Sequence, residues 1–587
     1  MKRALNIYLL LTFVVMLQMS CNKSWLKPDP LSTLTPENVY TDEAGFQSLI
    51  VTLRKNLKKE MYDGRNLFAQ EQAASDLAIP IFQIDFSKLT PSSDNFWKFL
   101  SLFTTSYGCI KDANVLISRI DGIKWANEQK RNIILGEAYW HRAYWYYRLV
   151  NSYGDVPWIG NEVQNAKLDF ATNSRWAILD KLQSDMEFAV QWLPEKAPAG
   201  AISKGAGNML LTKISLADGN FDKAIAAATA VINGPYALMK QRFGIDANNS
   251  GGNVIWDLHR PDNMNIPQNT ETILATVDRF EAPPGAKTTG TSSMRLYNCA
   301  AAYNSIVKDS QGKPGTIAAG GQYDTLGRGN CDVRLDPFYE YDVWAFENHT
   351  WKNTPDLRRS DFNWTDIDEI YYSNPASVDY MKPINPKWFA SPNDTLQGAY
   401  AMPTYITYVK QQNPTATPLG GNGDWYIFRL AEAYLLRAEA YIYKNEPGLA
   451  ANDINTVRER SHALPISAGK ATIDFIFDER ARELFAESPR HSELVRASYI
   501  MAKLNMGGYS LNNFSQKNYY YDRVMDKNIF YKQGILFYAN TISMKPYNVL
   551  WPILSTVITA NTLGVINQNI GYDGADKNIP PITTPIE

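Results

Sequence analysis

Residues 131–150, RNIILGEAYWHRAYWYYRLV, predict the long helix from which the fold of this chain can be worked out. Apolar residues recur in it every three or four positions, which is the period of one buried helix face: Leu135, Tyr139, Ala143, Tyr146 and Val150. Gly136 and Ala143 are small enough to let a neighbouring helix approach closely. The helix should end near Gly154, which can cap its C-terminus, because Pro157 forbids continuation.

Two helix pairs with a common pattern lie on either side of a long stretch of different composition. The first pair spans residues 175–193 and 204–217, and a turn around Gly219 leads from it into a further helix that ends near Ile232. The second pair spans residues 431–443 and 449–460. The helix–glycine turn–aromatic pattern resembles a tetratricopeptide unit, in which small residues let paired helices nest. Because the pairs are far apart in the sequence, we expect a helical scaffold with an inserted lobe, not one contiguous solenoid.

The intervening residues 233–424 are rich in Gly, Pro, Asn and aromatic residues and lack a long helical period. Residues 272–277 are a strand candidate, and Pro283-Pro284-Gly285 marks one of the loops. Long loops on a rigid scaffold are where binding sites usually occur. The expected fold is therefore mostly α. Tetratricopeptide-like pairs in residues 46–232 and 425–587 form the scaffold, and an irregular, loop-rich lobe with short strands at 233–424 binds the ligand.

The first residues predict export. Lys2 and Arg3 precede an apolar run at residues 5–19, and Cys21 follows it, which is the order of a bacterial lipoprotein signal at residues 1–20. Gln18 stands where leucine is usual, so an ordinary cleaved signal with an incidental cysteine stays open. A lipidated Cys21 would anchor the chain to a membrane, and the proline-rich residues 21–45 would form an extended tether.

Composition excludes several classes of protein. The 587 residues carry 58 Lys and Arg against 60 Asp and Glu, and this balance argues against nucleic-acid binding, which needs a basic surface. The hydrophobic content of 45% is that of a folded globular protein. No stretch after the signal is apolar enough to span a bilayer. Cys299 and Cys331 could pair in an oxidising compartment, but buried free thiols are an equal alternative.

Familiar catalytic motifs are missing from the sequence: H-E-x-x-H, G-x-S-x-G, Walker A and G-x-G-x-x-G. The histidines are scattered, and no two share one helix face, which disfavours a His-based metal site or triad. Residues 246–257 have part of the spacing of a calcium loop, but Asp257 replaces the usual glutamate, and a polar surface turn is the better interpretation. We expect no catalysis, no cofactor and no metal.

The charged run at residues 478–483 could suggest acid–base chemistry. At helical spacing, however, Asp478 and Glu479 would both meet Arg482. The run therefore predicts an ion network that stabilises the fold.

Several segments together resemble the SusD/RagB family of outer-membrane lipoproteins. They are the opening WL…P…T…Y at residues 25–40, the block at 131–157 that ends in YGDVP, the blocks at 426–440 and 478–490, and the closing WPI…N…QN…GY at 551–572. The loop block at residues 327–344 is also similar. The closing block departs from the family pattern at Leu554 and Ile570, where proline is usual. The resemblance covers nearly the whole chain from Cys21 to Tyr572.

The resemblance implies a non-enzymatic, cell-surface lipoprotein that caps a TonB-dependent, SusC-like β-barrel transporter of the outer membrane and helps to deliver oligosaccharides. A peptide-binding subunit of the same architecture is the alternative, and a glycoside hydrolase is a more distant one. The implied fold is largely helical, with tetratricopeptide-like pairs packed against an irregular ligand lobe. This agrees with the fold inferred from the residues themselves.

Ligand residues differ between members of the family, so the site prediction depends on the loop residues of this chain. An aromatic ring can cover the apolar face of a sugar ring, and basic side chains can donate to hydroxyls or carboxylates. The predicted ligand contacts are aromatic or basic: Phe82, Trp97, Trp256, Arg279, Phe280, Tyr297, Tyr323 and Arg328. Packing inside the protein is the competing role for each aromatic residue.

Overall fold

The computed structural model of the chain describes residues 36–62, 67–80, 88–93, 99–289, 307–317, 333–388, 401–408, 421–534, 536–537 and 540–586. Its longer α-helices are α3 (Glu43–Asn56), α6 (Phe99–Arg119), α7 (Glu128–Tyr153), α8 (Arg175–Trp192), α9 (Lys204–Asp218), α10 (Phe221–Ile232), α17 (Leu430–Tyr443), α18 (Pro447–Arg460), α19 (Ile473–Leu484), α20 (Arg490–Lys503) and α21 (Tyr519–Lys527). Shorter ones are α2 (Pro36–Val39), α4 (Lys59–Tyr62), α5 (Leu67–Ala73), α11 (Val254–Leu258), α15 (Pro337–Glu340), α16 (Thr404–Thr407), α22 (Ile529–Gln533) and α23 (Ser555–Ala560). The expectation of a mostly α fold is confirmed.

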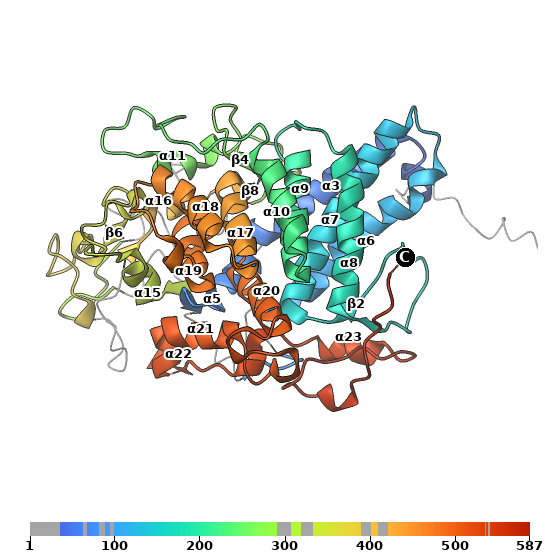
Figure 1. Cartoon of the computed structure of the whole chain (residues 1–587). Coiled ribbons are helices and arrows are strands. Elements are labelled where there is room, and N and C mark those ends of the chain that lie inside the picture. Colours follow the sequence, from blue (N-terminus) through green and yellow to red (C-terminus); the bar gives the residue numbers. More distant parts are fainter. Residues whose placement is uncertain are drawn as a thin grey trace, which may run out of the picture.

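The helices α7, α8, α9, α10, α17 and α18 pack one against the next in that order (Figure 1). The joint between α10 and α17 brings together the two pairs that the sequence separates. There the Phe221 ring stacks on Tyr443 with 5.0 Å between centroids, and Arg437 donates to the Thr229 hydroxyl at 2.9 Å. The scaffold is therefore continuous in space, although residues 233–429 interrupt it along the chain.

Local residue choices explain where these helices begin, end and approach one another. The Asn127 side chain accepts a hydrogen bond from the Lys130 backbone N–H and so caps the start of α7. Gly219 ends α9 with a φ of 83°, a left-handed conformation that glycine adopts without steric cost. A Cβ on Gly136 would lie 3.2 Å from the Cα of Ala189, so glycine there lets α7 and α8 pack closely, as its size predicts.

The strands are short and pair in twos. The antiparallel pairs are β1 (Ala78–Pro80) with β5 (Val333–Leu335), β2 (Val156–Pro157) with β3 (Thr172–Asn173), β4 (Thr272–Thr276) with β8 (Trp425–Arg429), β6 (Thr365–Asp366) with β7 (Ala401–Met402), and β9 (Leu536–Phe537) with β10 (Asn540–Thr541). The strand expected at residues 272–277 is β4. Its partner β8 runs directly into α17, so this pair joins the inserted region to the helical scaffold.

The described part of the chain begins at Pro36, and its C-terminal segment pairs with residues of the helical region. Residues 1–35, which hold the predicted signal and Cys21, lie outside the described ranges, and α3 begins at Glu43, within the predicted tether of residues 21–45. At the other end, Ile582 exchanges backbone hydrogen bonds with Thr172 and Ser174 at 2.9 and 2.8 Å. No helix in the described ranges has both the length and the apolarity needed to cross a membrane.

A buried ion network ties the inserted region to the C-terminal helices. Arg429, at the end of β8, lies 2.6 Å from Glu271, 2.6 Å from Glu483 and 2.5 Å from Glu487. Arg460 binds Glu271 and Glu483 from α18. Burial alone would raise the pKa of Glu483, but the surrounding arginine charges outweigh it and hold that pKa well below its usual range. Glu483 is therefore ionised and paired.

The charged run on α19 belongs to the same network. Glu479 lies 2.8 Å from Arg482, as its helical spacing predicts, and it also pairs with Arg358 and Arg458. The predicted contact between Asp478 and Arg482 is wrong: Asp478 instead lies 2.6 Å from Arg523 of α21. Helix α21 approaches α19 on the side where Asp478 projects, which spacing along one helix cannot reveal.

We predict that Arg429→Met destabilises the protein by about 3–5 kcal/mol, because it leaves three buried carboxylates without their shared cation. Urea-induced unfolding followed by tryptophan fluorescence measures the change. Lys240→Met is the control, since Lys240 and Glu459 form an exposed pair whose loss should cost no more than about 1 kcal/mol. Equal unfolding midpoints for the two variants would contradict the role given to Arg429.

A second prediction concerns acid. Burial, together with the charge of Arg148, lowers the pKa of His491 to about 3, whereas an unfolded histidine titrates near about 6.5. The folded state therefore disfavours protonation, and this contribution to stability is full above pH ~6.5 and falls by about 1.4 kcal/mol per unit as the pH drops toward 3.

His491 stacks on Trp551 with 4.4 Å between ring centroids, and His491→Phe keeps a stacked ring while removing the titrating group. We expect the variant to lose less unfolding free energy than the wild type between pH 6.5 and 4.5. The unfolding free energy of the variant should still depend on pH to some extent, because burial also lowers the pKa of His141. Parallel pH profiles of the two proteins would show that His491 does not carry this effect.

Candidate ligand-binding site

The structure describes three of the predicted ligand contacts. Trp256, Arg279 and Phe280 lie in described ranges. The other predicted contacts fall outside the described residues: Phe82, Trp97, Tyr297, Tyr323 and Arg328. They stay predictions.

Trp256, on α11, is enclosed by other side chains and is 9% exposed. Its indole N–H donates to Asp246 at 2.9 Å, and its ring meets Phe362 edge-on and stacks on Tyr408. The Arg260 guanidinium lies 3.9 Å from the centre of the same ring. The ring faces are therefore covered by protein. A ligand contact at Trp256 stays a prediction.

Two buried carboxylates hold one loop of the inserted region in place. Asp278 and Asp424 are at most 1% exposed. Asp278 accepts hydrogen bonds from the Thr288 backbone N–H and hydroxyl at 2.7 Å each, and from the Asn422 amide at 2.8 Å. Lys58 Nζ lies 3.2 Å from the same carboxylate. Because hydrogen bonds to an ionised acceptor are strong, Asp278 fixes the shape of the loop that follows it.

Asp424 links this arrangement, the carboxylate cluster, to Arg279. It accepts hydrogen bonds from the Asp278 backbone N–H at 3.0 Å, the Asn265 amide at 2.7 Å and the Arg279 guanidinium at 2.8 Å. The bond to Asp424 raises the pKa of Arg279, which stays charged. The Arg279 side chain is 45% exposed, so part of its guanidinium can still donate to a ligand.

Phe280 follows Arg279 and presents an exposed ring beside it. The Phe280 side chain is 40% exposed. Lys287 donates to the Phe280 carbonyl oxygen, and its ammonium lies 4.8 Å from the centre of the ring. The structure thus brings together two of the predicted contacts, an apolar ring and a charged donor, on a loop that the carboxylate cluster fixes.

Two contacts link the N-terminal part of the chain to the inserted region. Pro80, two positions before Phe82, pairs with Val333 in the β1–β5 ladder. The Tyr62 hydroxyl donates to the carbonyl oxygen of Gly423, next to the carboxylate cluster. The N-terminal helical region and the inserted region are therefore in contact at both of these places.

The carboxylate cluster could not be found from the sequence. Asp278 and Asp424 are far apart along the chain, and neither belongs to a spaced motif. The one available signal is that Asp278 directly precedes Arg279 and Phe280, two predicted ligand contacts. Contacts between loops depend on the folded path of both segments, which no local pattern encodes.

A separate groove of about 980 Å³ lies beside α7 and α8, and none of the three described contacts, Trp256, Arg279 and Phe280, lines it. Its aromatic residues are occupied by neighbours: the Arg142 guanidinium lies 5.0 Å from the Tyr139 ring centre and 5.1 Å from that of Trp158. Tyr146 stacks on Trp158 at 4.4 Å, and Asp185 pairs with Arg142 at 2.5 Å. These side chains are already engaged in contacts with one another, so the groove is a weaker candidate for the ligand site than the loop at Phe280.

Groups that could suggest catalysis have structural partners. His259 Nε2 lies 2.7 Å from Glu487, but that carboxylate also binds Arg429 within the buried network. Asp257, the last position of the calcium-like spacing, pairs with Arg242 at 2.5 Å. Within the described residues, no group of three His, Cys, Asp or Glu side chains could hold a metal ion. Burial raises the pKa of the Cys109 thiol to about 12, so it is not a nucleophile at neutral pH.

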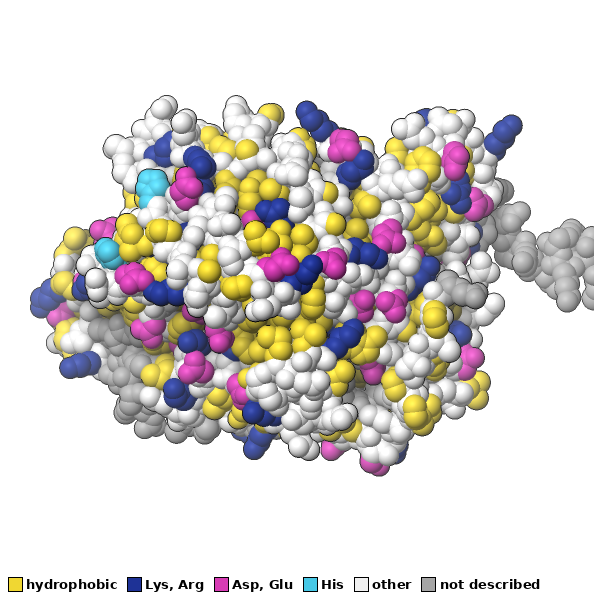
Figure 2. Space-filling view, viewed as in Figure 1, with side chains coloured by type: hydrophobic (Ala, Val, Ile, Leu, Met, Phe, Trp, Pro, Cys, Tyr) yellow, Lys and Arg dark blue, Asp and Glu magenta, His cyan; other side chains and the backbone are white. Residues whose placement is uncertain are grey.

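Charge on the visible surface is mixed. Figure 2 shows basic and acidic side chains interspersed over the face it presents, with apolar patches between them.

Two family models match the chain. Residues 256–572 match the model described as the SusD family, and residues 30–216 match one described as "Starch-binding associating with outer membrane". Among curated relatives, SusD-like protein P25 of Formosa agariphila is 22% identical over 83% of this chain and 89% of its own length. SusD-like protein P2 of the same organism is 29% identical over 38% of this chain and 46% of its own, so that match spans less than half of the relative.

Solved structures share the fold over nearly the whole chain. B. fragilis NanU superimposes with a TM-score of 0.61 at 18% identity, covering 93% of this chain and all of that one. A structure named "Laminarin binding SusD-like protein" has a TM-score of 0.61 at 19% identity, covering 91% of this chain and all of its own. At these identities the likeness establishes the fold alone.

We predict that Asp278→Ala releases the loop that carries Arg279 and Phe280 and lowers the free energy of unfolding by about 2–4 kcal/mol, because it leaves buried donors without their acceptor. Limited proteolysis should cleave within residues 279–289 faster than in the wild type. Glu281→Ala, an exposed acidic residue of the same loop, is the matched control and should behave as the wild type. Unchanged cleavage in Asp278→Ala would show that the cluster does not hold the loop.

Proposed function

The chain belongs to the SusD family, and on that premise we propose that it is a glycan-binding lipoprotein subunit of a TonB-dependent uptake system in the outer membrane. It binds oligosaccharide at the cell surface without catalysis and passes it to a SusC-like β-barrel transporter. Cys21 carries the lipid that anchors it. The peptide-binding alternative has no observation of its own in its favour.

The arrangement of Arg279 and Phe280 carries this proposal. A sugar ring has an apolar C–H face and a rim of hydroxyls, so it is bound best by an aromatic ring with hydrogen-bond donors beside it. Phe280 offers the exposed ring, and Arg279 offers the donors. Because Asp424 holds the guanidinium and Asp278 holds the loop, little conformational freedom is lost on binding.

The comparisons support the same ligand class. One relative, 34% identical over 20% of this chain, is the starch-binding protein SusD of Bacteroides thetaiotaomicron, and one solved structure of the same fold is named for laminarin binding. The second family model is named for association with the outer membrane. Lipid anchoring at Cys21 agrees with that location, since several acyl chains give stable attachment.

Partnership with a transporter follows from the family and from the form of the molecule. A subunit that stays with a barrel needs a large contact, of more than about 1,200 Å² in total. The helical stack and the buried ion network provide a rigid body that can carry such a contact while the loops at Arg279 and Phe280 meet the ligand.

We predict that Phe280→Ala weakens glycan binding about tenfold or more while the melting temperature stays within a few degrees, because the removed ring is largely outside the core. The measurement is isothermal titration calorimetry with a glycan selected on an array by the wild-type protein. Trp97→Ala, Tyr297→Ala and Tyr323→Ala test the other predicted platforms in the same way.

Ile245→Ala is the matched control, since Ile245 is an exposed apolar residue, 62% accessible, on another loop. Its affinity should equal that of the wild type. Normal binding by all four aromatic variants would refute this placement of the site, and a wild-type protein that bound peptides but no glycan would favour the alternative function.

A further inference from the structure

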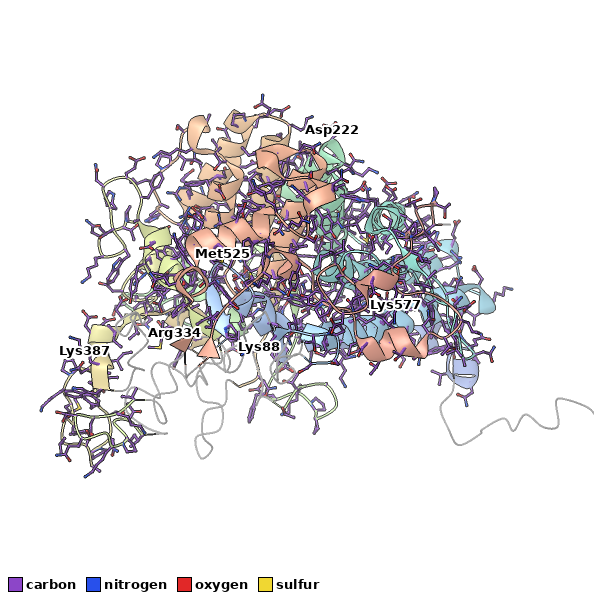
Figure 3. The ribbon with its side chains drawn as sticks, turned by 90° about the horizontal axis from the view of Figure 1, so that it is seen from below. Lys88, Asp222, Arg334, Lys387, Met525 and Lys577 are labelled. Atoms are coloured by element: carbon purple, nitrogen blue, oxygen red, sulfur yellow. The ribbon has the colours of Figure 1, made fainter. Side chains whose placement is uncertain are left out.

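A projecting lobe at the edge of the molecule carries exposed aromatic and basic side chains that are not part of the proposed site. The lobe consists of residues 307–317 and 370–388, and Figure 3 shows Lys387 at the edge of the ribbon beside the loops of this part. Backbone bridges join Lys308 to Pro314 and Tyr371 to Pro383. Each of the two segments thus doubles back on itself.

Two buried carboxylates fix these segments to each other. Asp309 accepts hydrogen bonds from the Lys313 backbone N–H at 2.9 Å and from the Ser377 hydroxyl at 2.9 Å. Asp379 accepts from the Ser310 backbone N–H and hydroxyl at 2.9 and 2.5 Å. Each carboxylate therefore reaches across to the other segment, and the lobe is rigid without a large apolar core.

Trp388 is mounted on this rigid base. Its ring lies nearly parallel to the Tyr372 ring, with 5.8 Å between centroids and 20° between planes. Tyr372 is fully buried, its hydroxyl donates to the Lys308 carbonyl oxygen, and it accepts from the Asn385 backbone N–H in the turn that bears Trp388. Trp388 itself is 39% exposed. A large aromatic ring is thus fixed from behind and open to solvent.

Other apolar side chains of the lobe are exposed as well. Val378, Tyr380 and Met381 are 50%, 48% and 56% accessible. Met381 adopts a φ of 63°, a left-handed conformation that costs a residue with a side chain about 1 kcal/mol or more. Exposed apolar area together with local strain is typical of a surface kept for binding.

The charges of the lobe have one sign where they meet solvent. Its acidic residues, Asp309 and Asp379, are buried and committed to the internal hydrogen bonds. Its exposed or half-exposed charged residues are all lysines: Lys308, Lys313, Lys382 and Lys387. Lys382 pairs with Asp379, and the other three have no ion pair with any residue that the structure describes. Exposed Asp368 and Glu369 lie directly before the lobe, but the charge that the lobe itself presents to solvent is positive and favours an anionic partner.

We propose that the projecting lobe is a second ligand-binding site of this protein and that it takes an acidic saccharide, one that bears carboxylate or sulfate groups. Trp388 covers the apolar face of a sugar ring, and the neighbouring Lys387 together with the other lysines of the lobe binds the anionic substituents. The inference rests on the proposed glycan-binding function and names the ligand class. The tryptophan selects a saccharide among anions, because a simple anion offers no apolar face for the ring to cover.

The test uses the purified mature chain with three probes: polygalacturonate, which carries carboxylates, a sulfated galactan, and neutral amylose. Affinity electrophoresis gives the dissociation constants. We expect the wild type to bind at least one acidic probe more tightly than amylose and to lose affinity as salt rises. Trp388→Ala should weaken that binding about tenfold, while Trp388→Phe retains most of it. The choice between the two acidic probes identifies the anionic group.

Charge is tested separately with the double variant Lys313→Gln/Lys387→Gln, which should weaken acidic binding severalfold and flatten its dependence on salt. Lys577→Gln removes an exposed lysine from the C-terminal segment and is the matched control (Figure 3). Both lysine variants should melt with the wild type, so this arm decides the question even if Trp388→Ala proves unstable. Unchanged acidic binding in the double variant would overturn the proposal.

The outcomes also separate this inference from the proposed function. If the wild type prefers amylose and Phe280→Ala abolishes that binding, the protein is a glycan-binding subunit and the acidic site does not exist. If the wild type binds no saccharide at all, both proposals fail.

Discussion

Arg429 is the point on which the arrangement of this molecule depends. It ends the strand that joins the inserted region to the second helical unit. Its guanidinium pairs with Glu271 from the inserted region, with Glu483 near the end of α19, and with Glu487 between α19 and α20. Removing such charges from water is costly, and the cost is met only when all partners are in place. The network therefore selects one relative placement of regions that are distant in sequence. Burial of apolar area does not fix one relative placement of these regions, because apolar contacts are not directional.

This placement has consequences at the surface. With the inserted region fixed on the scaffold, Asp278 and Asp424 can hold the loop of Arg279 and Phe280, and Lys58 reaches the same cluster from the N-terminal part of the chain. The projecting lobe is held in the same way on a smaller scale. There Asp309 and Asp379 accept the hydrogen bonds that fix the loops, and the lobe has no large apolar core. In both places buried carboxylates fix a loop that carries an exposed aromatic ring. The loop is rigid enough to bind a ligand, and the ring stays open to solvent.

The sequence could predict the helices but not the contacts that position the loops. The glycines at 219 and 136 act on their immediate neighbours, and the structure confirms both. The helix predicted at residues 131–150 is also present, but α7 is buried nearly all round and not along one face, and Tyr139 is only half-buried. Asp478 shows the limit, because its spacing indicated Arg482 and its partner is Arg523 of another helix. The joint between α10 and α17 and the pair formed by Asp278 and Asp424 likewise join segments with no shared local pattern. Of the predicted ligand contacts, Arg279 and Phe280 lie together and exposed, whereas Trp256 is enclosed.

The central claim is that this protein binds glycan and does not cleave it. The most direct measurement is a titration of the purified mature chain with an array-selected oligosaccharide, followed by an assay of the same mixture for new reducing ends after prolonged incubation. The account predicts saturable binding with one unchanged oligosaccharide recovered at the end. Release of reducing ends by the pure protein, or failure to bind any saccharide on the array, would contradict it.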